Sequence, residues 1–196
     1  KQQLAWLKDG IKNSKADFIF VVSSVNFMVP HVGSGGGADK QSTIKKDDAW
    51  TVFLKEREEL IEFWNGLDKG VFVLTGDLHN SFAIKITDNV YEFASGPHNS
   101  INHAPMKDEG GRPANGKFKY GPRSCDIRWS SYAMADIPRA NRTFPHYCVV
   151  QVNNVFNNPV ERDGERWFAF PHPQVIFHFH DALTGELRYS ETIVLG

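Results

Sequence analysis

Residues 71–79 read Val-Phe-Val-Leu-Thr-Gly-Asp-Leu-His, and this stretch decides the fold. Its first part, 71–75, is an uncharged run of strand length, and residues 18–22, Phe-Ile-Phe-Val-Val, form a similar one. Strands that are apolar on both faces are typical of a parallel sheet covered by helices. Between the two runs, a helical period predicts a helix whose apolar face is Trp50, Phe53, Leu54, Leu60, Ile61 and Trp64. Residues 18–75 therefore predict a right-handed βαβ unit with parallel strands.

The segments on either side of this unit extend the same pattern. Residues 4–11 carry leucine and isoleucine at helical spacing, which predicts a helix before the first strand. Asp47 or Asp48 is suited to cap the second helix. After the second strand, residues 82–87 alternate apolar and polar side chains, and residues 90–93 can return as an antiparallel partner. Residues 1–95 thus predict an α/β fold made of the βαβ unit and a hairpin.

The rest of the chain has a different character. Residues 30–47 are rich in glycine and lysine and predict a long loop, either functional or a surface insertion. Residues 96–145 show little periodicity, so we expect an irregular insertion of short helical turns and loops there. Residues 146–196 contain four runs of strand type and predict an antiparallel β-rich tail.

Charge and composition exclude several classes of protein. The 196 residues contain 22 Lys and Arg against 23 Asp and Glu, a net charge of −1. Binding to nucleic acid or to an anionic membrane normally requires a basic excess, so neither partner is expected. No apolar run approaches the roughly 18 residues of a membrane span. Cys125 and Cys148 leave open one disulfide or two free thiols.

The sharpest chemical signal is Gly76-Asp77-Leu78-His79, directly after the second strand. In open α/β sheets, ligands bind beyond the carboxyl ends of the strands, and the neighbouring strand ends close to Asn26 and His31. A carboxylate can bridge two cations, and imidazole binds zinc, iron or manganese. We therefore take Asp77, His79 and Asn26 as candidate metal ligands. The alternative is structural, with Asp77 capping the following turn and His79 merely packed.

Other polar residues carry weaker signals. His98 and His103 lie in a loop after the hairpin, from which they can reach the same crevice and donate a proton. His178 and His180 alternate with phenylalanines, which favours the polar face of a sheet over a metal pair. The irregular segment also holds four arginines that either bind an anion or lie on a solvated surface: Arg123, Arg128, Arg139 and Arg142.

Four segments together resemble the carboxyl-terminal part of the alkaline phosphatase D (PhoD-like) family of metallophosphatases. Residues 3–7 resemble its Gln-x-x-Trp-Leu helix, and residues 18–24 resemble the strand that follows. Residues 48–57 resemble its Asp-x-Trp…Arg helix, and residues 73–79 resemble its Val-Leu-Thr-Gly-Asp-x-His segment. The resemblance covers residues 1 to about 100 and implies part of an α/β/β/α metallophosphatase sandwich.

The resemblance also implies an activity and a site. Asp77 and His79 match the family's metal ligands, which implies two metal ions, such as Ca, Fe, Zn or Mn. The implied reaction is hydrolysis of a small phosphate ester, monoester or diester, by metal-activated water. From their position in the loop after the hairpin, we take His98 or His103 as its proton donor. A periplasmic or secreted location is also implied. The alternative is a non-catalytic binding module or a homologue that has lost its metal site.

The motif order predicts that the earlier metal motifs belong to an amino-terminal half of the same polypeptide. No further motif of the metallophosphatase type follows His79, so Gly-Asp-x-His fits the last motif of the family rather than its first. Two metal ions need more ligands than Asp77 and His79 offer. We therefore expect the isolated residues 1–196 to be inactive or nearly so.

Overall fold

The computed structural model describes residues 2–31, 49–132, 136–162 and 165–195. The glycine-rich loop predicted over residues 30–47 lies almost entirely outside the described residues. The helices are α1 (Gln2–Asn13), α2 (Leu54–Asn65), α3 (Pro105–Asp108) and a 3-10 turn, η1 (Arg139–Asn141). The strands are β1 (Phe18–Val22), β2 (Gly70–Thr75), β3 (Phe82–Lys85), β4 (Val90–Ala94), β5 (Gly116–Tyr120), β6 (Arg123–Ser130), β7 (His146–Arg162), β8 (Glu165–Asp181) and β9 (Leu187–Val194).

The βαβ unit is confirmed. β1 and β2 pair in parallel with Phe20 opposite Phe72, and α2 connects them. The hairpin is also confirmed, because β3 and β4 are antiparallel, and β4 lies parallel to β2 on its other side. One boundary differs from the expectation: α2 begins at Leu54, well after Asp48. The preceding residues form turns instead, and the Trp50 indole donates a hydrogen bond to Ser23 Oγ (3.1 Å).

The expectation of only turns and loops over residues 96–145 is wrong. β5 and β6 form an antiparallel hairpin, and β6 pairs with β3, so the main sheet has the order β1-β2-β4-β3-β6-β5. The alternating pattern that marks β5 in the sequence is short: Phe118 is buried, and the lysines on either side of it are exposed. Such an alternation spans too few residues to stand out between glycines.

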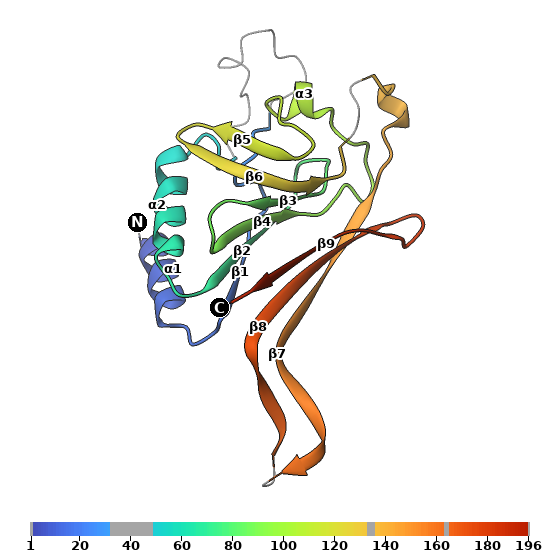
Figure 1. Cartoon of the computed structure of the whole chain (residues 1–196). Coiled ribbons are helices and arrows are strands. Elements are labelled where there is room, and N and C mark those ends of the chain that lie inside the picture. Colours follow the sequence, from blue (N-terminus) through green and yellow to red (C-terminus); the bar gives the residue numbers. More distant parts are fainter. Residues whose placement is uncertain (1, 32–48, 133–135, 163–164, 196) are drawn as a thin grey trace.

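The main sheet is the middle of three layers (Figure 1). One face packs against α1 and α2 through Ile11, Leu60 and Trp64. The other face packs against a second antiparallel sheet of order β7-β8-β9, which confirms the β-rich tail. The Phe93 and Phe177 rings stack between the two sheets with centroids 3.5 Å apart. Because both faces are covered, every residue of β4 is buried.

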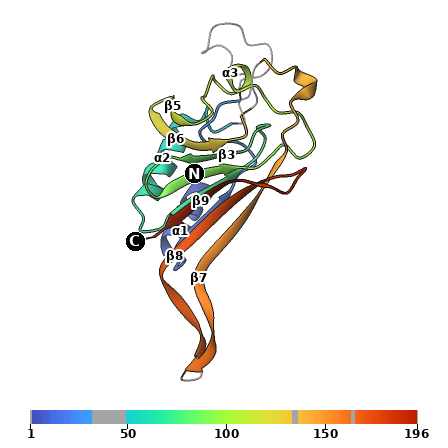
Figure 2. The ribbon, with the colours of Figure 1, turned by 45° about the vertical axis from the view of Figure 1, so that its right-hand side comes forward.

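Beyond the apolar core between the main sheet and the β7-β8-β9 sheet, β7 and β8 continue as a long two-stranded ribbon that projects away from the body (Figure 2).

Cys125 and Cys148 are both free thiols. They pack in the two different cores, on opposite faces of the main sheet, and burial raises the pKa of each to about 12. None of the described helices is long and apolar enough to cross a membrane.

Candidate metal centre

The turn after β2 presents Asp77 and His79 on the same edge of the sheet. Leu78, between them, is anchored in the core with 3% exposure, and its N–H bonds back to the Gly76 carbonyl (2.8 Å). Asp77 adopts a left-handed backbone conformation (φ 65°), the only described non-glycine residue to do so. Such a conformation is uncommon for aspartate and is frequent at functional sites. The fold therefore holds two potential ligands at the carboxyl end of a central strand.

The His79 ring is oriented by its Nδ1 atom. This nitrogen lies 2.8 Å from the Ile101 carbonyl oxygen and 3.2 Å from Ser100 Oγ. A carbonyl only accepts, so Nδ1 carries the proton, and the lone pair is on Nε2. Metal-binding histidines are commonly oriented in this way. Burial lowers the pKa of His79, and the neighbouring His103 lowers it further, which favours the neutral ring that a metal requires.

Two more histidines complete a cluster around Asp77 and His79. His31 Nδ1 lies 3.1 Å from Asp77 Oδ2. The His103 ring stacks on His79 with centroids 4.3 Å apart, and it lies 4.9 Å from the His31 ring. Within the described residues, no three His, Cys, Asp or Glu side chains are arranged to hold one metal ion. The cluster thus offers an oxygen and a nitrogen ligand, beside two further imidazoles.

With this geometry in view, the family can be assigned. The family model for PhoD-like phosphatases matches residues 1–126, more than half of the chain. This chain belongs to the PhoD-like phosphatase family. The match runs from α1 into β6 and includes the Asp77–His79 turn. No curated protein matches the chain. Membership of this phosphatase family indicates a phosphoesterase.

In this PhoD-like phosphatase chain, a buried polar network fixes the loops that carry His79 and His103. Glu109 is fully buried and pairs with the equally buried Arg112 at 2.5 Å. Asn80 donates to Glu109 Oε1 (2.8 Å), and Asn102 donates to Asn80 Oδ1 (3.0 Å). Asn80 and Asn102 adjoin the two histidines in sequence, so the network sets the separation of the two rings.

The charge of Glu109 is stabilised within this network. Burial opposes its ionisation, but the Arg112 guanidinium, the nearby His103 ring and the hydrogen bond from Asn80 outweigh this effect and lower the pKa of Glu109. His103 Nδ1 lies 3.6 Å from Glu109 Oε1, so the carboxylate also orients the His103 ring. The sequence showed no sign of this role, because polar contacts between distant loops have no periodic signature.

A second buried carboxylate holds the segment that leads to His31. Glu92, in β4, accepts hydrogen bonds from the Phe27 and Met28 backbone N–H groups (both 2.8 Å) and from Thr75 Oγ1 (3.0 Å). Burial raises the pKa of Glu92, against the lowering effect of these donors and of Asn26. Asn26 is 1% exposed, and neither of its amide atoms makes a hydrogen bond of normal geometry. Asn26 is therefore buried beside Glu92.

The other polar residues singled out from the sequence fall elsewhere. His98 is exposed and lines a separate hollow of about 460 Å³. His178 and His180 lie on the polar side of β8, bonded to Ser190 Oγ and to the Gly185 carbonyl, while the phenylalanines between and before them are fully buried. Of the four arginines, Arg123 and Arg128 form ion pairs with glutamates and aspartate. Arg139 and Arg142 instead line a hollow beside the histidine cluster.

Proposed function

We propose that this chain carries part of a metal-dependent phosphoesterase site, with Asp77 and His79 as metal ligands. The observation that carries the proposal is the Asp77–His79 turn at the end of β2, matched within the family model. The two side chains fit the role: a carboxylate oxygen is a donor that Ca or Mn accepts, and an imidazole Nε2 is a donor that Fe or Zn accepts. When bound, two such cations supply an activated water and neutralise charge on the phosphate.

The remaining residues of the cluster have roles that follow from their positions. His31 bonds to the Asp77 carboxylate and orients it. His103 lies against both His31 and His79, and we assign it the protonation of the leaving oxygen. His98 lines a different hollow and is the second candidate for this step. The Asn26 amide, buried beside Glu92, is the third candidate ligand.

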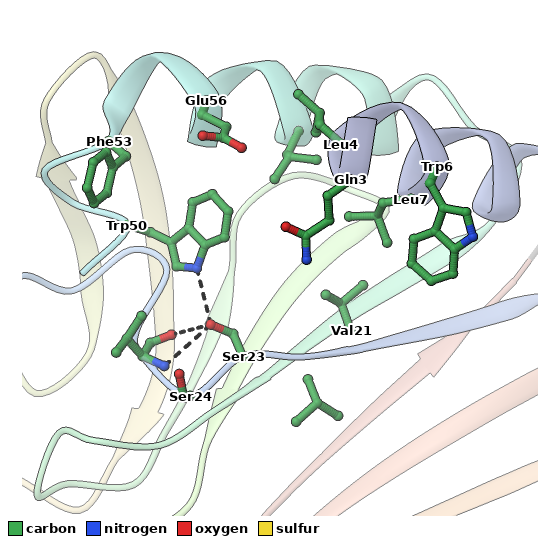
Figure 3. A pocket seen from close by; sticks show the side chains of 13 residues that line it. Gln3, Leu4, Trp6, Leu7, Val21, Ser23, Ser24, Trp50, Phe53 and Glu56 are labelled. Atoms are coloured by element: carbon green, nitrogen blue, oxygen red, sulfur yellow. Dashed lines mark hydrogen bonds between the residues drawn. The ribbon is translucent and has the colours of Figure 1, made fainter. Parts of the chain in front are cut away.

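The proposal requires more ligands than the described residues bring together. We propose that an amino-terminal half of the same polypeptide supplies them and completes a four-layer α/β/β/α sandwich. An apolar hollow of about 590 Å³ between β1, α1 and α2 supports this (Figure 3). β1 is the edge strand on its side of the sheet. Val22 at the end of β1 is 81% exposed, and Trp6 in α1 is 74% exposed. Surfaces of this kind commonly mark an interaction site.

The site assignment is tested by Asp77→Ala and His79→Ala in the intact polypeptide that contains residues 1–196. Residues that only hold metal ligands in place already contribute about 10–100-fold to metal affinity or activity. Loss of a ligand itself should therefore reduce phosphodiesterase activity by at least about 100-fold in each variant. Both should also lower the bound metal, measured by elemental analysis after gel filtration. Asp88→Ala and His178→Ala remove the same residue types at distant sites and should change neither quantity.

Unchanged metal content and activity in both site variants would contradict the assignment. A polypeptide that never hydrolyses a phosphate ester, with or without added metal, would instead favour a non-catalytic binding module. The isolated 196-residue chain should itself be inactive or nearly so, since the residues that the structure describes bring together only part of a ligand set. For the intact polypeptide, we propose a small phosphate ester as the substrate and a periplasmic or secreted location.

A further inference from the structure

A polar hollow of about 320 Å³ opens beside the histidine cluster. His31 and His103 form one wall, so the hollow adjoins the two side chains that contact Asp77 and His79. Its other walls come from the α3 segment, with Lys107 and Asp108, and from the η1 segment, with Arg139 and Arg142. Neither segment contributes a proposed metal ligand.

The charges of this hollow are predominantly positive. Lys107 and Arg139 are exposed, and among the described residues neither forms an ion pair. The carboxylate of Asp108 is already bonded, since its Oδ2 accepts the Ala104 backbone N–H (2.8 Å). The hollow therefore presents three cationic side chains against one carboxylate that is held by the backbone.

Arg142 is the fixed element of this arrangement. It is 9% exposed, and its Nε donates to the Ile137 carbonyl (3.0 Å). Its own carbonyl accepts from the Asn102 backbone N–H (2.7 Å), which ties η1 to the polar network under His79. A guanidinium held in this way loses little conformational entropy when it binds an anion. Arg123 and Arg128 do not line this hollow, and they are paired with acidic side chains.

We propose that this hollow binds a second anionic group of the substrate. Resting on the proposed function, the inference is that the phosphoesterase acts on organic phosphates that carry another phosphate-sized anion near the ester. The ester phosphorus would lie at Asp77 and His79, and the second anion would lie against Lys107, Arg139 and Arg142. Arginine and lysine form charge-assisted hydrogen bonds with phosphate oxygens, which are the stronger kind.

The test is binding of inorganic phosphate to the 196-residue chain in the presence of EDTA and at low ionic strength. Without metal, the Asp77 carboxylate repels an anion, so the hollow is the expected site. Amide NMR shifts should saturate for residues 101–108 and 139–142. Lys107→Gln/Arg139→Gln should raise the dissociation constant at least fivefold, and Asp108→Asn should lower it. Lys117→Gln, an exposed lysine on β5, is the matched control and should leave it unchanged.

Binding that saturates and weakens only in the double variant supports the hollow as an anion site. Absence of saturable binding, or equal binding by the double variant, overturns the inference. This readout is independent of metal and of hydrolysis, so it separates failure of the inference from failure of the proposed function. The latter is decided by the Asp77 and His79 variants alone.

Discussion

Replacing Glu109 by alanine is expected to lower the free energy of unfolding by about 3–5 kcal/mol, the usual effect of breaking a buried ion pair. Glu109 and Arg112 are both fully buried and lie 2.5 Å apart. Removing the carboxylate leaves the Arg112 charge in the core without its acidic partner, and it removes one of the two acceptors of the Asn80 amide. Urea denaturation of the 196-residue chain measures the effect.

Two controls identify the cause of this loss. Asp88→Ala removes an exposed partner of Lys85 and should change stability little. Glu109→Leu/Arg112→Leu removes both charges, so it should recover a large part of the stability that Glu109→Ala loses. If the double variant is as unstable as the single one, the buried charge is not the cause. A Glu109→Ala chain within about 1 kcal/mol of the parent would contradict the account of the network.

Phe177→Ala is expected to cost a similar amount, about 3–5 kcal/mol. Phe177 is fully buried in β8, and its ring stacks on Phe93 and lies 5.3 Å from Phe72. Truncation therefore opens a cavity between the main sheet and the β7–β9 sheet. Because this core joins the two sheets, the whole chain should unfold in a single transition at a lower urea concentration than the parent. Circular dichroism and tryptophan fluorescence should report the same transition.

The matched control for this prediction is Val149→Ala, on the exposed side of β7, which should change stability by less than about 0.5 kcal/mol. Two separate transitions in the Phe177→Ala chain, with the main sheet unaffected, would show that the β-rich tail is an independent unit. That result would contradict the three-layer packing described above.

The sequence predicted the parts of the fold that depend on long regular patterns. The runs at 18–22 and 71–75 are apolar on both faces, which predicted their parallel pairing correctly. Burial on both faces holds for β2 but not for β1, an edge strand in which only Phe18 is buried. The position of Asp77 and His79 at a strand end followed from the same reasoning. Where patterns were short the prediction failed, as for β5, in which Phe118 is the only buried residue.

The supporting residues of the site were beyond sequence reasoning for a physical reason. Asn80, Asn102 and Glu109 meet through hydrogen bonds between separate loops, and such contacts impose no periodicity on any segment. Glu92 has the position of a solvent-facing residue in an alternating strand. It is buried because a loop crosses over it and donates two backbone N–H groups to its carboxylate.

The central claim is that Asp77 and His79 bind a metal ion, and titration of the isotope-labelled chain with Mn²⁺ tests it most directly. The paramagnetic ion broadens NMR signals of nuclei close to it, so even weak binding by Asp77 and His79 is detected, and no enzymatic activity is required. We expect the amides of residues 76–80 and 100–103 to broaden first, and this effect to disappear in Asp77→Ala/His79→Ala. Broadening that begins elsewhere, or that persists in the double variant, would contradict the claim.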